Sequence, residues 1–572
     1  MKELLLSNQA IARGAWEAGV KFAAGYPGTP STEIIETLAA RFPETNPRWS
    51  ANEKVAFEEG MGAAIGGLRV LVTMKHVGLN VAADAIMVFP YAGTNGGFVF
   101  LSADDPGMHS SQNEQDNRYL ARMGKIPVLE PSDAQEAHDF VISGMELSEH
   151  FSSPVMLRTT TRLAHHKGLV EVGERQEIPL REFIPDPKRF SVPIYRRLHR
   201  PKVEARLDAL RKYAETCEYN RVEHTSSNAG VVTSGISYQY VKEVLPEAGV
   251  LRLGMTFPLP PNLLRDFCAR YETVYVVEEG EPFIEEYMRS LGITNLKGKE
   301  IFGVIGEYSP GRLRESLGLG EVPKPFTGGI NLLPRPPMLC TGCGHRTVFA
   351  ALRQLKVIVS GDIGCYTMGA LPPYEAEHTT FCMGASIGTA IGLERAGHER
   401  VVAIIGDSTF IHAGIPPLID AVYNGSTLTL IILDNSATGM TGSQPHPASG
   451  KNVRGEDAPK LDLVALCRAA GVEKVDVVDT WQRKDVVRTI RKSVAYKGPS
   501  VVIAQGPCVQ LPERKQQLRK LVPYTVTEEL CTKCDACFKV WCPAITRTEE
   551  GFPVIAANEC TTCTVCAQVC PT

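Results

Sequence analysis

Two short apolar runs constrain the fold of this 572-residue chain more than any other feature. Val401–Ile405 and Leu428–Leu433 are uninterrupted and rich in β-branched residues, a pattern typical of strands that are buried on both faces of a parallel sheet. The segment between them is long enough for a crossover helix, which parallel neighbours require. The sequence therefore predicts an α/β fold with parallel sheets.

A polar pair follows each of these predicted strands. Gly406 and Asp407 follow the first run, and Asp434 and Asn435 follow the second. Ligands bind beyond the carboxyl ends of parallel strands, where the side-chain oxygens of Asp407 and Asn435 suit Mg2+ that also holds a diphosphate. Gly406 allows a sharp turn and the close approach of a phosphate. The pattern predicts the diphosphate and magnesium site of a thiamine diphosphate enzyme, although an ordinary βαβ unit with acidic turn residues has the same short pattern.

Half of the 16 cysteines lie in the last segment, residues 524–572. The second group of four has the spacing C-x2-C-x2-C-x3-C-P of bacterial ferredoxins, and in the first group the fourth cysteine comes one residue later. In this pattern the fourth cysteine of each group binds the other group's cluster. We therefore expect two [4Fe-4S] clusters, one held by Cys531, Cys534, Cys537 and Cys570, and the other by Cys560, Cys563, Cys566 and Cys542. Zinc is the alternative metal, but zinc sites rarely need so many cysteines.

Composition argues against a nucleic-acid-binding or membrane protein. The net charge of −4 offers no basic surface, and no stretch approaches the roughly 18 uncharged apolar residues of a membrane helix. The apolar run in MKELLLSNQA is too short for a signal peptide. We expect a soluble, cytoplasmic protein, whose cysteines serve metal or redox chemistry because disulfides are rare there.

The order of strand-like, helix-like and linker-like segments predicts four domains. A first α/β domain has a Gly- and Ala-rich helix after Asn52, which indicates very close packing. The predicted parts are a first α/β domain (1–180), a linker with an amphipathic helix (181–228), a second α/β domain (229–325), a connector (326–337), a third α/β domain (338–510), a basic linker (511–523) and the cysteine-rich domain (524–572).

Seven motifs carry a resemblance to a known family. They are GYPGTPSTEI (Gly25–Ile34), NEKVAFE (Asn52–Glu58), MKHVGLNVAADAIM (Met74–Met87), CTGCGHR (Cys340–Arg346), GDIGCYTMGALPP (Gly361–Pro373), IIGDSTFIHAGI (Ile404–Ile415) and DNSATGMTGSQPHP (Asp434–Pro447). With the cysteine-rich end, they resemble the 2-oxoacid:ferredoxin oxidoreductases over nearly the whole chain. The MKHVGLN motif resembles the large (alpha) subunits of the indolepyruvate branch rather than the pyruvate and 2-oxoglutarate branches.

The resemblance implies how the domains share the cofactor. The first domain would bind the pyrimidine ring of thiamine diphosphate and the third its diphosphate, with the active site between them across a dimer interface; the second would be similar to the C-terminal domain of transketolase. Asp407, Asn435 and the backbone carbonyl of Ala437 are the implied Mg2+ ligands, and Gly406 and Ser408 the implied cofactor contacts.

The resemblance also implies roles for other residues. Glu58 matches the glutamate that hydrogen-bonds the pyrimidine ring and helps to activate it, although a solvated helical glutamate, or a role for Glu59, suits the residues alone. Thr29 and His76 are expected to contact the substrate, with a turn hydroxyl and a core histidine as the alternatives. Arg118 is a further candidate for pairing with the substrate carboxylate, and a surface salt bridge is its alternative.

Four more cysteines match a cluster close to thiamine in pyruvate-type relatives: Cys340, Cys343, Cys365 and Cys508. A third [4Fe-4S] cluster suits chemistry in which electrons leave one at a time. The alternatives are buried structural cysteines and the two-cluster composition of indolepyruvate-type subunits. The remaining cysteines, Cys217, Cys268, Cys382 and Cys467, have no partner by spacing and are expected to be structural.

The implied activity is oxidative decarboxylation of arylpyruvates such as indolepyruvate and phenylpyruvate. Coenzyme A would take the acyl group, CO2 would leave, and electrons would pass from thiamine diphosphate through the clusters to ferredoxin. A separate small (beta) subunit is expected, in an α2β2 assembly. The alternatives are another 2-oxoacid as substrate, a non-oxidative thiamine enzyme, which would not need the cysteine-rich end, and an electron-transfer subunit without thiamine chemistry of its own.

Overall fold

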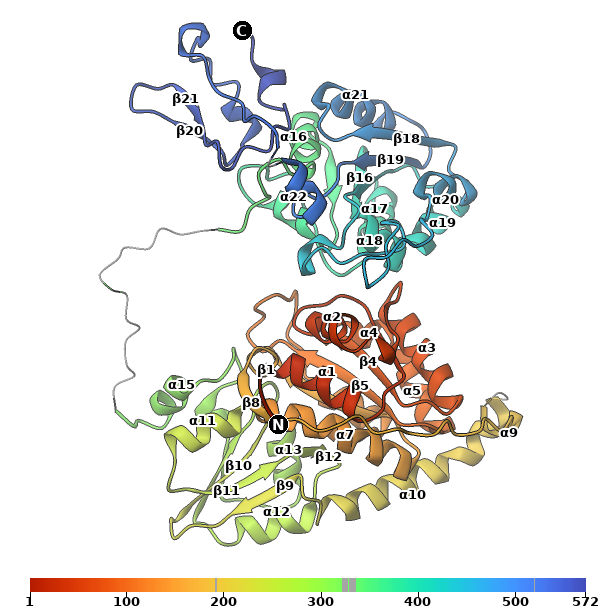
Figure 1. The fold of residues 1–572 in the computed structure, drawn as a ribbon, viewed down its shortest axis with the longest axis vertical. Helices are drawn as coiled ribbons and strands as arrows, with labels where there is room; N and C mark the ends of the chain where they lie inside the picture. Colours follow the sequence, from red (N-terminus) through yellow and green to blue (C-terminus); the bar gives the residue numbers. More distant parts are fainter. Residues whose placement is uncertain (191–192, 321–327, 329–335, 519) are drawn as a thin grey trace. The chain divides into compact units, whose positions relative to one another are not determined.

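The computed structural model describes residues 1–190, 193–320, 328, 336–518 and 520–572 (Figure 1). The chain forms two compact units, Met1–Ile330 and Asn331–Thr572. The predicted connector over 326–337 lies almost entirely outside the described residues. No helix in the described ranges is long and apolar enough to cross a membrane.

A seven-stranded sheet forms the centre of the first unit. Its strands lie in the order β12-β6-β7-β5-β4-β2-β3, and every neighbouring pair is parallel except β12 with β6. The strands are Phe22–Gly25 (β2), Pro47–Trp49 (β3), Val70–Lys75 (β4), Phe98–Asp104 (β5), Val128–Leu129 (β6), Val155–Thr160 (β7) and Met255–Phe257 (β12). Strands β4, β5 and β7 are buried at every position, so both faces of this part of the sheet are covered.

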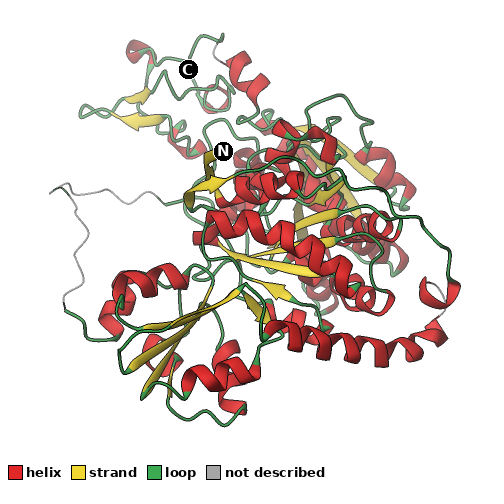
Figure 2. Cartoon of the chain, turned by 60° about the horizontal axis from the view of Figure 1, so that its bottom comes forward, coloured by secondary structure: helices red, strands yellow, loops and turns green. Residues whose placement is uncertain are grey.

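Helices supply that cover (Figure 2). The helices Glu53–Ile65 (α3) and Ala83–Ala92 (α5) share a core with β4 and β5, while Ser7–Glu17 (α1) and Ala134–Phe151 (α7) pack against each other. A Cβ added at Gly60 would lie 2.7 Å from Val72 Cγ2, so the Gly- and Ala-rich helix is packed as closely as the sequence indicates. A short ribbon of Lys2–Leu6 (β1) and Lys167–Glu171 (β8) completes this part.

The second sheet of this unit draws on residues ahead of the predicted domain start at 229. Its order is β14-β13-β10-β11-β9, with β9 antiparallel to β11 and the other pairs parallel. The strands are Asn220–Glu223 (β9), Ala229–Ser234 (β10), Gly249–Leu253 (β11), Thr273–Val277 (β13) and Leu296–Lys297 (β14), and the helices include Arg196–Ala214 (α10), Ser237–Val244 (α11), Pro261–Cys268 (α12), Phe283–Ser290 (α13) and Pro310–Ser316 (α15). The predicted linker thus supplies α10 and the edge strand β9, and β12 returns to the first sheet.

The second unit contains the two strands from which the α/β fold was predicted. Val401–Gly406 (β16) and Thr429–Asp434 (β17) lie in a five-stranded parallel sheet with Ile358–Ser360 (β15), Lys474–Asp479 (β18) and Ser500–Gln505 (β19), in the order β15-β16-β17-β19-β18. Alternate residues of β16 face opposite layers: Val402 and Ile404 pack with the helices His345–Leu355 (α16) and Arg483–Val494 (α21), and Ala403 and Ile405 with Ala385–Arg395 (α17), Ile415–Tyr423 (α19) and Leu463–Ala469 (α20). The parallel α/β class is confirmed.

The cysteine-rich end has little regular structure of its own. A two-stranded antiparallel ribbon, Ile545–Arg547 (β20) with Pro553–Ile555 (β21), is accompanied by 3-10 turns at Phe538–Val540 and Ala567–Val569. Few buried apolar side chains hold this segment together, which is typical of a small domain that depends on bound metal for stability.

Candidate functional site

The carboxyl ends of β16 and β17 are joined through one carboxylate. Asp407, which is 2% exposed, follows β16 directly. Its Oδ1 accepts a hydrogen bond from the backbone N–H of Ser408, and its Oδ2 accepts from the N–H groups of Asn435 at 3.0 Å and Ser436 at 2.7 Å. The two polar pairs predicted to meet at this edge of the sheet are therefore in contact.

Negative charge is concentrated at this edge. Burial and the neighbouring Asp407 raise the pKa of Asp434. His446 Nε2 lies 3.3 Å from Asp407 Oδ2, and His345 Nε2 lies 3.4 Å from Asn435 Nδ2. Burial lowers the pKa of His345 to about 4, so this imidazole is neutral at physiological pH and does not balance the carboxylates. Two neighbouring buried carboxylates and an amide oxygen form a donor set that suits a hard divalent cation.

The backbone at Gly406 is closely packed against a neighbouring side chain. A Cβ at Gly406 would lie 2.8 Å from Tyr366 Cε1, so only glycine fits there. Ser408 Oγ accepts a hydrogen bond from Thr438 Oγ1 at 3.0 Å, and Ala437, which is 2% exposed, donates its N–H to Asn435 Oδ1 at 3.0 Å. The residues predicted to contact the diphosphate and Mg2+ therefore lie on two adjoining loops.

In the first unit, the predicted substrate residues lie at the carboxyl ends of β2 and β4. Thr29 is partly exposed in the turn that follows β2. A Cβ at Gly28 would lie 2.9 Å from Lys75 Cβ, so this turn lies against the end of β4. His76 is fully buried, and its Nε2 lies 3.2 Å from Asn113 Oδ1. Its Nδ1 is buried and has no hydrogen-bond partner among the described residues, so His76 is not a fully satisfied core histidine, and its contact with the substrate stays a prediction.

Glu58 does not have the buried environment expected for a residue that activates the pyrimidine ring. It is exposed in the second turn of α3 and pairs with Lys54 one turn earlier. Glu53, at the first position of the same helix, is 4% exposed, and its Cγ lies 2.6 Å from where a Cβ at Gly78 would be. Asn52 caps the helix by accepting from the N–H of Val55. The NEKVAFE motif thus contains a buried carboxylate that sequence reasoning missed, and its place directly after the N-cap was the available signal.

Arg118 is not available to a substrate. It is fully buried, with Nη2 at 2.5 Å from Asp116 Oδ2 and Nη1 at 2.8 Å from Glu278 Oε2. A second buried arginine, Arg158, pairs with Asp104 and Glu130. The pair with Glu278 connects Arg118 to the segment after β13. Because Arg118 is buried among carboxylates, it forms neither the substrate contact nor the surface salt bridge that was considered for it.

The four cysteines of the third α/β domain lie close to one another. Burial raises the pKa of the Cys343 thiol to about 12, and the nearby thiols of Cys340, Cys365 and Cys508 contribute to this shift. Burial and the nearby thiols of Cys508 and Cys340 also raise the pKa of Cys365. The four cysteines come from the loop before α16, the turn after β15 and the segment after β19. Cys365 Sγ would also lie 3.4 Å from a Cβ at Gly439, in the loop that carries Asn435.

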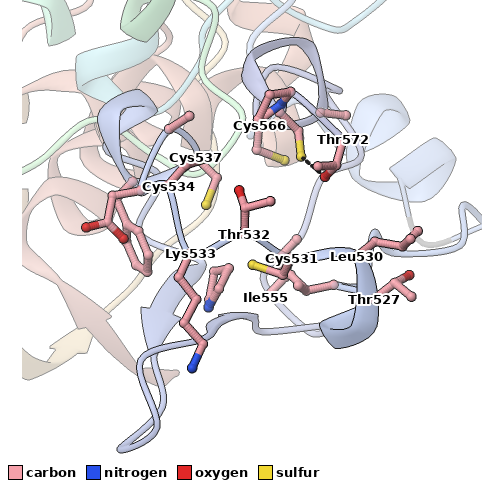
Figure 3. Close-up of a pocket in the computed structure, with 18 of the residues that line it drawn as sticks. Thr527, Leu530, Cys531, Thr532, Lys533, Cys534, Cys537, Ile555, Cys566 and Thr572 are labelled. Atoms are coloured by element: carbon pink, nitrogen blue, oxygen red, sulfur yellow. Dashed lines mark hydrogen bonds between the residues drawn. The ribbon is translucent and has the colours of Figure 1, made fainter.

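The eight cysteines of the tail fall into the two predicted groups. Cys531, Cys534, Cys537 and Cys570 line one pocket, which Cys566 also borders (Figure 3). Burial raises the pKa of the Cys542 thiol, and the nearby thiols of Cys563 and Cys560 add to this shift. Burial and the thiols of Cys563, Cys542 and Cys560 likewise raise the pKa of Cys566. The fourth cysteine of each group therefore lies with the other group, as ferredoxin spacing requires. In the described ranges no three His, Cys, Asp or Glu side chains are placed to hold a single metal ion, but a cube of four irons spaces its thiolates more widely.

The tail packs directly on the third α/β domain. Gln568 Nε2 donates to the carbonyl of Trp481 at 2.6 Å, and the Trp481 indole donates to the carbonyl of Gly342 at 3.0 Å. One small cavity is lined by Cys343 from the first set and by Cys542, Cys563 and Cys566 from the second tail group. A buried cation, Arg346, also lines this cavity. The two cysteine sets are therefore neighbours.

Two family models match the parts of the chain that contain these features. Residues 13–226 match "Pyruvate flavodoxin/ferredoxin oxidoreductase, thiamine diP-bdg", and residues 362–504 match "Thiamine pyrophosphate enzyme, C-terminal TPP binding domain". These matches confirm that the chain contains thiamine diphosphate-binding domains.

Similarity to curated proteins extends over the whole chain. "Indolepyruvate oxidoreductase subunit IorA" of Archaeoglobus fulgidus is 42% identical, covering 100% of this chain and 96% of the relative. The proteins of the same name from Methanothermobacter marburgensis and Pyrococcus horikoshii are 42% and 39% identical, covering 99% and 100% of this chain and 96% of each relative. At this identity over the full length, the chain belongs to the family of indolepyruvate oxidoreductase IorA subunits, within the thiamine-dependent 2-oxoacid oxidoreductases.

Proposed function

We propose that this large subunit oxidatively decarboxylates arylpyruvates, with indolepyruvate as the preferred substrate, and transfers the acyl group to coenzyme A. The observation that carries the proposal is the combination, in one chain, of thiamine-binding domains and a cysteine-rich tail packed beside Cys343. A decarboxylase without redox chemistry has no use for such a tail. The aryl preference rests on the names of the relatives.

The cofactor would be held from both ends. Asp407, Asn435 and the carbonyl of Ala437 would bind Mg2+, and Gly406 and Ser408 would contact the diphosphate. Glu53 is our candidate for the pyrimidine ring, in place of Glu58, because a buried carboxyl at a helix start can exchange a proton away from water. Thiamine diphosphate, when bound, supplies the electron sink for loss of CO2.

The cysteines would provide the route for electrons. We assign two [4Fe-4S] clusters to the tail groups and a third to Cys340, Cys343, Cys365 and Cys508, because each set of four lies together in the fold. The third set lies next to the loop of Asn435 and borders the second tail group. This order gives one-electron steps from the cofactor to the tail, and from there to ferredoxin.

The assembly would include a second kind of chain. The word "subunit" in the relatives' names implies a partner chain, which we propose to be a small beta subunit. An α2β2 assembly is part of the same proposal. The division of the chain into four domains joined by linkers, with the pyrimidine-binding domain at 1–180 and the diphosphate-binding domain at 338–510, belongs to the same proposal. We place the complex in the cytoplasm, where thiols remain reduced.

The experiment compares Asp407→Ala with Asp420→Ala in the purified complex. Asp420 is exposed on α19 and lies outside the site, so its variant is the matched control. With indolepyruvate and coenzyme A, the wild type and Asp420→Ala should reduce their clusters and then ferredoxin, and Asp407→Ala should lose thiamine diphosphate and at least 100-fold of the rate, since metal and cofactor binding fail together. Unchanged ferredoxin reduction in Asp407→Ala would reject thiamine chemistry in this chain and favour an electron-transfer subunit.

A further inference from the structure

Lys75 is a buried cation on the ligand-binding edge of the first sheet. It is the last residue of β4, in the MKHVGLN motif, and is 9% exposed. Its Nζ donates to the backbone carbonyl of Ser110 at 2.6 Å and lies 3.3 Å from Ser110 Oγ. Ligands of parallel sheets bind at the carboxyl ends of the strands, so Lys75 lies where a ligand is expected.

Asp105 is the carboxylate that attracts Lys75, but its oxygens accept hydrogen bonds from other groups. Asp105 accepts from the N–H of Ser110 at 2.8 Å, from Ser111 Oγ at 2.6 Å and from Thr161 Oγ1 at 2.6 Å. Burial lowers the pKa of Lys75, and the attraction of Asp105 only partly opposes this effect. Within the described part of the chain, Lys75 forms no ion pair with a carboxylate. A buried ammonium group in this state gains from an anionic ligand.

The neighbours of Lys75 connect it to the substrate end of the site. Gly28 lies against it, since a Cβ there would be 2.9 Å from Lys75 Cβ, and Thr29 follows in the same turn. His76, the residue after the strand, is fully buried, with Nε2 beside Asn113 Oδ1 and no hydrogen-bond partner for Nδ1 among the described residues. Of the two basic residues in MKHVGLN, Lys75 is the one whose ammonium group suits an anionic ligand.

We infer that Lys75 binds the carboxylate of the 2-oxoacid substrate, beside Thr29. The inference rests on the proposed function and assigns the substrate's charged end to a residue that sequence reasoning passed over. The inference also predicts whether the loss of Lys75 changes KM or kcat. Negative charge leaves the carboxylate as CO2 departs, so Lys75 binds the ground state at least as strongly as the transition state, and its loss should raise KM rather than lower kcat.

The experiment measures binding as well as turnover in the assembled enzyme. The probes are 3-(indol-3-yl)propanoate, which keeps the carboxylate but lacks the reactive carbonyl, and its neutral amide. Lys75→Met should weaken propanoate binding about 10- to 100-fold, as expected for one charged hydrogen bond, and leave amide binding unchanged. KM for indolepyruvate should rise by a similar factor with kcat within about threefold, and Lys75→Arg should recover most of the affinity.

Lys21→Met is the matched control, because Lys21 directly precedes β2 at the opposite end of the same sheet and its side chain is 40% exposed. It should change neither probe. If Lys75→Met weakens the propanoate and the amide equally, Lys75 only supports the loop at Ser110 and the inference is wrong; unchanged propanoate binding rejects it too. Failure of the proposed function has a different signature: wild-type enzyme would bind the propanoate and yet show no 2-oxoacid-dependent cluster reduction.

Discussion

At the scale of single residues, burial separates the two glutamates of the NEKVAFE motif. Glu58 is exposed and paired with Lys54, while Glu53 is buried at the start of α3 against Gly78. The sequence places both on one helix but does not show which turn faces the sheet. Helix α3 is rich in glycine and alanine, so its apolar periodicity is too weak to decide the question.

Glu53→Gln should therefore lower 2-oxoacid-dependent cluster reduction about 100- to 10,000-fold, the usual range for loss of a general acid or base. Glu58→Gln should retain activity within a few-fold, because its solvated ion pair contributes little. Deuterium exchange at the reactive thiamine carbon, measured in the same proteins, locates the defect at activation of the cofactor. If Glu58→Gln is the inactive variant, the sequence-based assignment is right and ours is wrong.

A second residue-scale prediction concerns pH. Burial raises the pKa of Glu377 from 4.5 to about 8. Between these values the folded protein holds a proton that the unfolded chain has released, so this group's contribution to the free energy of unfolding falls as pH rises toward 8. Glu377→Gln should gain roughly 1–3 kcal/mol relative to wild type between pH 6 and pH 9, as measured by denaturant unfolding. Glu375→Gln, at an exposed position, is the control; parallel pH profiles for wild type and Glu377→Gln would contradict the prediction.

At the scale of elements, local pattern and long-range pairing were not equally predictable. The runs at Val401 and Leu428 identify β16 and β17 almost to the residue, because both faces of each strand are buried and the apolar signal is continuous. The signal fails where pairing crosses domain boundaries. Strand β12 is only three residues long and returns to the first sheet, and β9 lies in a charge-rich stretch. Neither has a local pattern that reveals its partner.

The contact between the tail and the third α/β domain gives an element-scale prediction. Gly342 has φ +72°, and a Cβ there would lie 1.8 Å from Thr561 Oγ1. Gly342→Ala should lower the melting temperature and increase hydrogen exchange both in the Cys340–Arg346 loop and in the tail, because the two surfaces must separate. In the control, Gly388→Ala, the new methyl group meets nothing within 4 Å on helix α17, so it should be neutral or stabilise by up to about 1 kcal/mol. Increased exchange confined to the loop would show that the tail does not depend on this contact.

In the molecule as a whole, the proposed route for electrons uses three cysteine sets rather than two. The ferredoxin spacing alone predicts the tail groups, since close spacing defines them. The set around Cys343 comes from three separate segments, and spacing cannot show that they meet; the resemblance suggested the set, and the fold brings it together.

Iron content tests this third set. The reconstituted complex should contain about 12 Fe per large subunit, and Cys365→Ser should lower this to about 8, at four Fe per cluster. Cys382→Ser, an exposed cysteine outside the three sets, should retain the wild-type content. A wild-type value near 8 would leave only the tail clusters and would return Cys340, Cys343, Cys365 and Cys508 to structural roles.

The most direct test of the central claim, that thiamine-bound substrate electrons pass to clusters in this same chain, is a stopped-flow experiment without ferredoxin. The complex is mixed with coenzyme A and, in turn, indolepyruvate, phenylpyruvate, pyruvate or 2-oxoglutarate, and bleaching of the broad cluster absorbance is recorded. The account predicts rapid bleaching that is fastest with indolepyruvate and is abolished by Asp407→Ala. Faster bleaching with pyruvate or 2-oxoglutarate would contradict the substrate assignment, and absence of bleaching with every 2-oxoacid would contradict the central claim itself.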